Sequence, residues 1–284
     1  KVNNQGLGET ANDMVCVGND LFIVVSGSAS VMVVDKTTCK LKKMINIVNS
    51  ANVNRQPRHI TYYNNAVYVS CFDGNIVKIS TEDYSIKGVV ETGGRNPDGM
   101  AVMNGMLYVT NSGGLSYPNY DNTVSVIDLS SFSFVKKITV SSNPTIVKTY
   151  NDKVYVLSFG DYSTTPVLTR ISSNNEVIDS ISKNITDFDF YEDKIYYFYH
   201  NYTTNTYSLN YINVNNLNAS PTRFTQNISS LILPYHINII DGIIYVTDAK
   251  NYTTSGQVFA FSTSGSLLYS FQTSVNPSKI IKIQ

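Results

Sequence analysis

A short aromatic motif recurs along this chain at an interval that suits one supersecondary unit. Its clearest copy is Leu107-Tyr108-Val109-Thr110-Asn111. The aromatic position of this motif, the anchor, is occupied in turn by Phe22, Tyr68, Tyr108, Tyr155, Tyr196 and Tyr245, at spacings of 46, 40, 47, 41 and 49 residues. A repeat of about 40–45 residues that carries four strands is typical of a propeller blade. The period therefore predicts an all-β repeat architecture.

Turn signals keep the same rhythm. A polar pair precedes each anchor: Asn19-Asp20, Asn64-Asn65, Asn104-Gly105, Asn151-Asp152, Glu192-Asp193 and Asp241-Gly242. Pairs such as Asn-Gly and Asp-Gly favour type I′ hairpins, whose central residues need positive φ. A polar turn also follows each repeat's third strand, at Asp35, Ser80, Asp128, Ser172, Asn213 and Ser262. Each repeat is thus predicted to hold four short antiparallel strands, which in the third repeat cover 99–103, 106–111, 123–128 and 134–140.

Proline marks the boundaries between repeats, because it suits a strand start where no ladder bond is lost. It occurs at Pro57, Pro97, Pro144, Pro234 and Pro277. After Pro277 we expect one more first strand, over 279–283. Six complete repeats plus this strand predict a seven-bladed β-propeller of four-stranded antiparallel blades. Residues 1–284 then form a single domain whose closing blade lacks strands upstream of Lys1; six blades and a tail are the alternative.

Composition excludes several classes of function. Lys and Arg total 21, as do Asp and Glu, so there is no basic field for nucleic acid. The sequence lacks a run of 18 apolar residues that could span a membrane. The three cysteines form no metal or haem motif, and we predict no cofactor.

The loops between second and third strands are predicted to lie on one face with the crossovers between blades. They are long in the last four repeats and rich in tyrosine among small polar residues, which is typical of binding surfaces. We therefore predict ligand contacts at Tyr117, Tyr120, Tyr162, Tyr202 and Tyr252. The alternative is that each tyrosine only covers the rim of its own blade.

The crossovers and first strands supply a second set of candidate ligand-binding residues near the propeller axis. These are Arg58, Arg95, Asp98, Tyr235, His236 and Lys279. Arginine can clamp a carboxylate or phosphate, although these charges could instead pair with one another. His59 and His236 occupy equivalent positions in two repeats, but they are expected on different sides of a wide ring. We therefore predict no metal site for them with His200.

Two segments carry a family resemblance. Tyr-Val-Thr-Asn at 108–111 and Asn-Pro-Asp-Gly at 96–99, with the turns around Asp35 and Asp128, resemble the YVTN-repeat, YncE-like propellers. The opening at 7–14 is similar to a segment of surface-layer-type lipoproteins of gut Bacteroidetes. The resemblance implies a seven-bladed, non-catalytic propeller of the cell envelope, as an outer-membrane surface lipoprotein or in the periplasm, with a lipid anchor upstream of this chain. Some relatives capture cobalamin for an outer-membrane transporter, but no residue here matches a cobalamin site.

Three functions remain open. The leading one is a non-catalytic propeller that captures a large nutrient such as cobalamin. The second is a module that docks a surface protein or glycan through the tyrosine-rich loops. The third is a hydrolase or lyase at the channel mouth, for which His59, His236, Asp98 and Asp187 are candidates without an evident partner. We predict that the chain is not an enzyme; a close pairing of either histidine with a carboxylate would favour the third function.

Overall fold

The computed structural model describes residues 3, 6–225 and 228–283. The chain divides into two compact units: unit 1 comprises residues 1–182 with 283–284, and unit 2 comprises residues 183–282. Every sheet has four antiparallel strands, each hydrogen-bonded to the next along the chain. These are propeller blades, as the repeat predicts.

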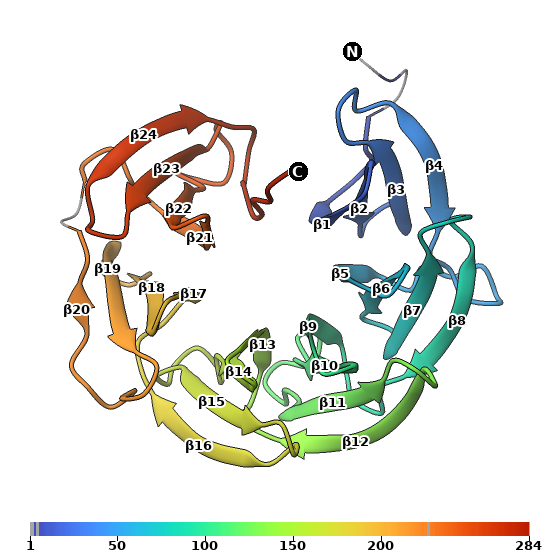
Figure 1. The fold of residues 1–284 in the computed structure, drawn as a ribbon, viewed down its shortest axis with the longest axis horizontal. Coiled ribbons are helices and arrows are strands. Elements are labelled where there is room, and N and C mark those ends of the chain that lie inside the picture. Colours follow the sequence, from blue (N-terminus) through green and yellow to red (C-terminus); the bar gives the residue numbers. More distant parts are fainter. Residues whose placement is uncertain (1–2, 4–5, 226–227, 284) are drawn as a thin grey trace. The chain divides into compact units, whose positions relative to one another are not determined.

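Unit 1 holds four blades. The first two are β1 (Ala11–Val17), β2 (Asp20–Val25), β3 (Ser30–Asp35) and β4 (Leu41–Asn46), then β5 (Pro57–Tyr63), β6 (Ala66–Cys71), β7 (Asn75–Ser80) and β8 (Ile86–Glu91). The next two are β9 (Pro97–Met103), β10 (Met106–Asn111), β11 (Thr123–Asp128) and β12 (Ser133–Thr139), then β13 (Pro144–Tyr150), β14 (Lys153–Ser158), β15 (Val167–Ser172) and β16 (Val177–Ser182). The four sheets follow an arc within unit 1, with β1, β5, β9 and β13 on its concave side (Figure 1).

Unit 2 holds two blades. They are β17 (Asp187–Tyr191), β18 (Lys194–Asn201), β19 (Thr206–Asn213) and β20 (Thr222–Arg223), then β21 (Pro234–Ile240), β22 (Ile243–Asp248), β23 (Gln257–Ser262) and β24 (Leu267–Gln272). Strands β17 and β21 contact each other. The prediction of seven blades is wrong, because the described residues form six four-stranded sheets. Residues 279–283, expected as a further first strand, are not a strand. Every first strand here pairs with the second strand of its own blade, and none follows Pro277.

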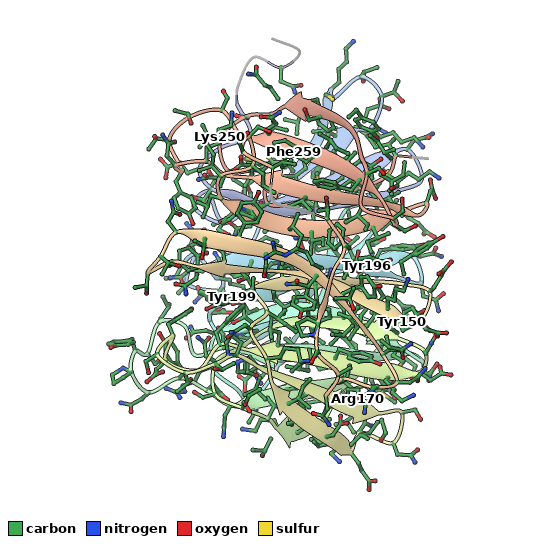
Figure 2. The ribbon with its side chains drawn as sticks, turned by 90° about the vertical axis from the view of Figure 1, so that its left-hand side faces the viewer. Tyr150, Arg170, Tyr196, Tyr199, Lys250 and Phe259 are labelled. Atoms are coloured by element: carbon green, nitrogen blue, oxygen red, sulfur yellow. The ribbon has the colours of Figure 1, made fainter. Side chains whose placement is uncertain are left out.

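The core lies between the faces of neighbouring blades. In unit 1, Tyr68 of β6 packs with Leu107 and Val109 of β10, and Tyr108 packs with Val154 and Val156 of the next blade. Five of the six anchors are at most 1% exposed, whereas Tyr245 is half-buried and bonds Tyr269 through its hydroxyl. In unit 2, Tyr196 and Phe259 are buried in one cluster (Figure 2). Apolar burial on both faces explains why the inner strands lack alternation.

Five of the six hairpin turns before the anchors form at the predicted pair, whereas the first lies one residue earlier, because Asp20 already pairs with Val17. Positive φ occurs at both central residues of the hairpins at Asn64-Asn65, Asn104-Gly105, Asn151-Asp152 and Asp241-Gly242. The Asp35 carboxylate accepts hydrogen bonds from the backbone N–H groups of Thr37 and Thr38. These local bonds stabilise the connection between third and fourth strands.

Crossovers and second-to-third loops lie side by side, as predicted. The N–H of Ser112 donates to the carbonyl of Asn96, and the N–H of Phe159 donates to that of Asn143. The N–H of Ala249 makes the equivalent bond to Leu233 in unit 2. In these blades the second-to-third loop and the preceding crossover therefore lie at the same end. No helix in the described part of the chain is long and apolar enough to cross a bilayer.

Candidate functional site

Three neighbouring first strands of unit 1 bring charged side chains together. Asp13 comes from β1, Arg58 and His59 from β5, and Asp98 from β9; we call these four residues the charged cluster. Strand β5 contacts both β1 and β9. The β5 register shifts between Pro57 and Ile60, where it pairs with β6. Such a bulge re-aims side chains, which is common beside functional sites.

Asp13 joins the first two blades. Its Oδ2 lies 3.2 Å from Nδ1 of His59 and accepts a hydrogen bond from the N–H of Ile60 at 3.1 Å. Its Oδ1 accepts the N–H of Met14 at 2.9 Å. The carboxylate is buried and its charge is well compensated, as a buried carboxylate requires. Asp13 thereby fixes the orientation of the His59 ring.

Asp98 faces the same histidine from the third blade. Its Oδ1 lies 3.1 Å from Nε2 of His59 but outside hydrogen-bond geometry, so the contact is an ion pair. Nε of Arg58 is 3.9 Å from the same oxygen, and both atoms are closed to solvent and without a hydrogen bond. The Arg58 guanidinium stacks over Phe72, 4.6 Å from its ring centre. The N–H donor of Arg58 and the carboxylate acceptor of Asp98 thus face each other, and neither has a hydrogen-bond partner.

The electrostatics of the charged cluster depend on His59. Desolvation lowers the pKa of this imidazole, but the carboxylates of Asp13 and Asp98 outweigh it and raise the pKa from 6.5 to about 9. His59 is therefore an imidazolium at neutral pH. Two carboxylates, one imidazolium and one guanidinium give the cluster no net charge. The His59 and Arg58 side chains are 36% and 32% exposed, so a ligand can reach them.

Unit 2 repeats half of this arrangement. Oδ2 of Asp187, on β17, lies 2.6 Å from Nδ1 of His236 on β21 and accepts the N–H of Ile237 at 3.1 Å. Nε2 of His236 is buried without a hydrogen bond. The repeat thus carries a structural Asp–His contact, to which unit 1 adds a second carboxylate. Within the described residues, no three His, Cys, Asp or Glu side chains are grouped so as to hold a metal ion.

The structure brings some predicted site residues together and separates others. Arg58 meets Asp98 in the charged cluster, whereas Arg95 lies 3.8 Å from Asp121 on a loop. Tyr117, Tyr120 and Tyr162 form one aromatic row in unit 1. In unit 2, three pairs form: Tyr202 with His200, Tyr252 with Tyr235, and His236 with Asp187. Lys279 lies after β24, outside any strand.

Sequence reasoning missed Asp13 and the pairing of both histidines with carboxylates. A signal was present, because Asp13, His59, Asp187 and His236 each lie nine residues before the anchor of their repeat. An Asp at this position in one repeat and a His in the next predict a contact once neighbouring first strands are placed side by side. Asp98 lies ten residues before its anchor, so it breaks the pattern.

Comparison with protein families gives one match. Residues 7–159, more than half of the chain, match the family model described as methylamine dehydrogenase heavy chain (MADH). These residues include the whole charged cluster. The prediction that the chain is not an enzyme is wrong on this ground, since the family is described by the heavy chain of a dehydrogenase. No curated protein sequence matches the chain.

Solved structures show the same fold at low sequence identity. Hydrazine synthase of Kuenenia stuttgartiensis matches with a TM-score of 0.76 and 15% identity, over 97% of this chain and 91% of that one. The computationally designed Ika8 protein matches with 0.66 and 10%, over 94% and 89%. A quinonprotein alcohol dehydrogenase-like protein from Bacteroides thetaiotaomicron matches with 0.64 and 14%, over 93% and 66%.

Proposed function

Because this chain belongs to the methylamine dehydrogenase heavy chain family, we propose that it is the substrate-binding propeller of an enzyme. A small polar substrate binds at the charged cluster, and His59 donates a proton to it. The reaction is of the hydrolase or lyase type, in which the positioned acid protonates an oxygen of the substrate. This places the activity on residues 13–98, inside the region that matches the family.

One observation carries the proposal. Nε of Arg58 and Oδ1 of Asp98 are buried, 3.9 Å apart and unsatisfied. A buried polar atom without a partner costs about 1–3 kcal/mol, and native structures contain few of them. A ligand hydroxyl or amine can accept from Arg58 and donate to Asp98, which would satisfy both atoms. A ligand enters over the exposed parts of Arg58 and His59 when the guanidinium rotates off Phe72.

The charge balance selects the kind of group that binds. Because the two cations and two anions of the charged cluster cancel, a strong anion or cation would leave one residue repelled. A neutral group that is both donor and acceptor meets no such penalty. Hydroxylated lactones and other neutral hydroxyl compounds are therefore the substrates to test.

The acid step follows from the orientation of the imidazolium. Asp13 holds the Nδ1 side of His59, which leaves the Nε2 proton beside Asp98 and Arg58 where the substrate binds. In hydrolysis a water molecule attacks the substrate carbonyl carbon, the bond from that carbon to the leaving oxygen breaks, and the Nε2 proton passes to the leaving oxygen. The proton that the water loses returns through solvent to the neutral ring. Acid catalysis of this kind contributes about 10²–10⁴-fold to rate.

An activity screen with matched variants tests the proposal. His59→Gln removes the acid and should lower kcat at least about 100-fold on any substrate that the wild type converts. Asp98→Asn and Arg58→Met should raise KM. His236→Gln is the control, because it removes the equivalent Asp–His contact in unit 2 and should leave turnover unchanged. Full activity in the His59→Gln variant would reject the site.

The ligand and location expected from the sequence resemblance stay predictions. A nutrient such as cobalamin, a partner transporter and attachment at the cell envelope are supported only by the sequence resemblance at 7–14, 96–99 and 108–111 and in the turns around Asp35 and Asp128. A calorimetric titration of the chain with cyanocobalamin tests the first of these. Binding that is lost in the Arg58→Met variant would assign that ligand to the charged cluster.

A further inference from the structure

Four aromatic rings form a continuous row across two neighbouring loops of unit 1. On the loop at 112–122, Tyr117 and Tyr120 have ring centres 6.0 Å apart and planes at 71°. Tyr120 then meets Tyr162, on the loop at 160–166, at 6.2 Å and 81°. Tyr162 stacks on Phe159 at 6.2 Å and 14°. We call these four residues the tyrosine row; it shares no residue with the charged cluster.

Two tyrosines of the row expose most of their side-chain surface to solvent, so they do not serve mainly to cover the edge of their own blades. Tyr117 is 73% exposed and Tyr162 is 70% exposed. Single exposed apolar residues are common on protein surfaces, whereas a contiguous exposed patch marks an interaction site. The prediction that these tyrosines only cover their own blades does not explain rings that contact one another across two blades.

The loops that carry the row are held in place by their own polar groups. Asp121 accepts hydrogen bonds from the N–H groups of Arg95 and Asn122, at 2.9 and 2.7 Å. Asp161 accepts the N–H and hydroxyl of Ser163, at 3.0 and 2.7 Å. Ring positions are therefore preset, and binding costs little ordering entropy.

The chemistry around the row limits the partner. The loops at 112–122 and 160–166 contain no Lys or Arg, so they offer nothing to a phosphate or an acidic chain. Both of their carboxylates are engaged in loop bonds. Small hydroxyl and amide side chains lie next to the rings in sequence, at Ser116, Asn119 and Ser163. The loops thus carry no cation of their own, and their two anions are held in local bonds.

We propose that the tyrosine row binds a neutral saccharide chain. A sugar ring presents an apolar C–H face that stacks on tyrosine and equatorial hydroxyls that bond the phenol and the small polar side chains. Proline-rich segments also bind aromatic surfaces, but they occupy grooves between rings. In the tyrosine row, neighbouring rings are nearly perpendicular, at 71° and 81°. They therefore present a ring face and a ring edge in turn and do not form the two parallel sides of a groove.

Affinity electrophoresis and calorimetry test this proposal on the full chain. The probes are soluble xylan, mannan, β-glucan and chitin oligosaccharides, with an acidic pectin and a polyproline peptide for comparison. At least one neutral saccharide should bind, and Tyr117→Ala and Tyr162→Ala should each weaken binding about tenfold, the equivalent of 1.4 kcal/mol. Tyr202→Ala is the control, because Tyr202 is 64% exposed but lies in unit 2.

Each contrary result overturns the proposal. These are a failure of every neutral saccharide to bind, binding that survives in the Tyr117→Ala, Tyr162→Ala double variant, or preferential binding of polyproline or pectin. The melting temperatures of the variants should match the wild type, which separates lost binding from lost folding. The tyrosine row and the charged cluster share no residue. The His59→Gln variant should therefore bind saccharide as the wild type does, whether or not the proposed enzyme activity is found.

Discussion

Asp13 and His59 are joined across two blades, with Oδ2 of the carboxylate 3.2 Å from Nδ1 of the ring. Asp187 and His236 make the same contact in unit 2 at 2.6 Å. In both places the same carboxylate oxygen accepts the N–H of the residue after the histidine. The contact therefore belongs to the way neighbouring first strands are held together, and the charged cluster is built on it.

Removing one of these carboxylates should destabilise the fold. Asp187→Ala leaves the N–H of Ile237 without its acceptor in a buried setting, which costs about 2–3 kcal/mol for a bond to a charged group. Asp187→Asn keeps an acceptor oxygen and should cost less. Urea unfolding measures the loss. Exposed Asp193, in the turn between β17 and β18, gives the control Asp193→Ala, and an equal loss there would contradict the interpretation.

The raised pKa of His59 predicts a pH-dependent stability. Its folded-state pKa of about 9 exceeds the usual 6.5, so the stabilisation is complete below pH 6.5 and is lost as pH rises through 9. Because a third of the side chain is exposed, solvent screening limits the effect to about 1 kcal/mol. His59→Gln should flatten unfolding free energy between pH 6.5 and 9.

Nuclear magnetic resonance gives the direct measurement. The ring protons of His59 should titrate near pH 9 in the wild type, and Asp98→Asn should bring the midpoint lower because one carboxylate is gone. His236→Gln serves to assign the resonances and should leave the His59 midpoint in place. A midpoint near 6.5 in the wild type would show that the two carboxylates do not hold the proton.

Close packing between first strands gives a third prediction. A Cβ atom at Gly99 would lie 2.4 Å from the carbonyl oxygen of Thr145 on the next blade. Gly99→Ala therefore forces β9 away from β13, and overpacking of this kind costs about 1–3 kcal/mol. Gly6→Ala is the matched control, since a Cβ atom added at Gly6 would meet nothing within 4 Å. Thermal unfolding distinguishes the two; equal melting temperatures would contradict the close approach.

The sequence predicts local structure well because the blades are built from local signals. In the third repeat, 106–111 and 123–128 are strands with the predicted bounds. Five of the six anchors are buried, and four of the predicted hairpins have positive φ at both central residues. The prediction of a seventh blade was wrong because a segment with the composition of a strand, such as the one after Pro277, forms a strand only where a partner strand is available.

The candidate site was only partly predictable, because it depends on which residues face each other across blades. Arg58 and Asp98 were expected near one another, but the contact of Asp13 with His59 follows from the β5 bulge and the placement of neighbouring first strands. The shared offset of nine residues from the anchor indicates this contact only once neighbouring first strands are placed side by side. The tyrosines could be named from loop length and composition, whereas their assembly into a row depends on how two loops approach.

The outer strand β24 carries the fourth prediction, which concerns self-association. All six of its residues are exposed, and Leu268, Tyr269 and Phe271 are each between 46 and 49% exposed. Among the fourth strands in the described residues, β24 alone carries no charge, whereas β12 carries Lys136 and Lys137. Lysine on an edge strand blocks pairing with another chain. An uncharged apolar edge is therefore the place where two copies would pair.

Leu268→Lys should lower self-association while changing unfolding free energy by less than about 0.5 kcal/mol, as surface substitutions do. Light scattering against protein concentration measures the change. Phe134→Lys is the matched control, because Phe134 is 42% exposed on β12, an edge that two lysines already protect. If Phe134→Lys lowers self-association more than Leu268→Lys does, the prediction for β24 is wrong. The added charge would then act on the molecule as a whole and not on this edge strand.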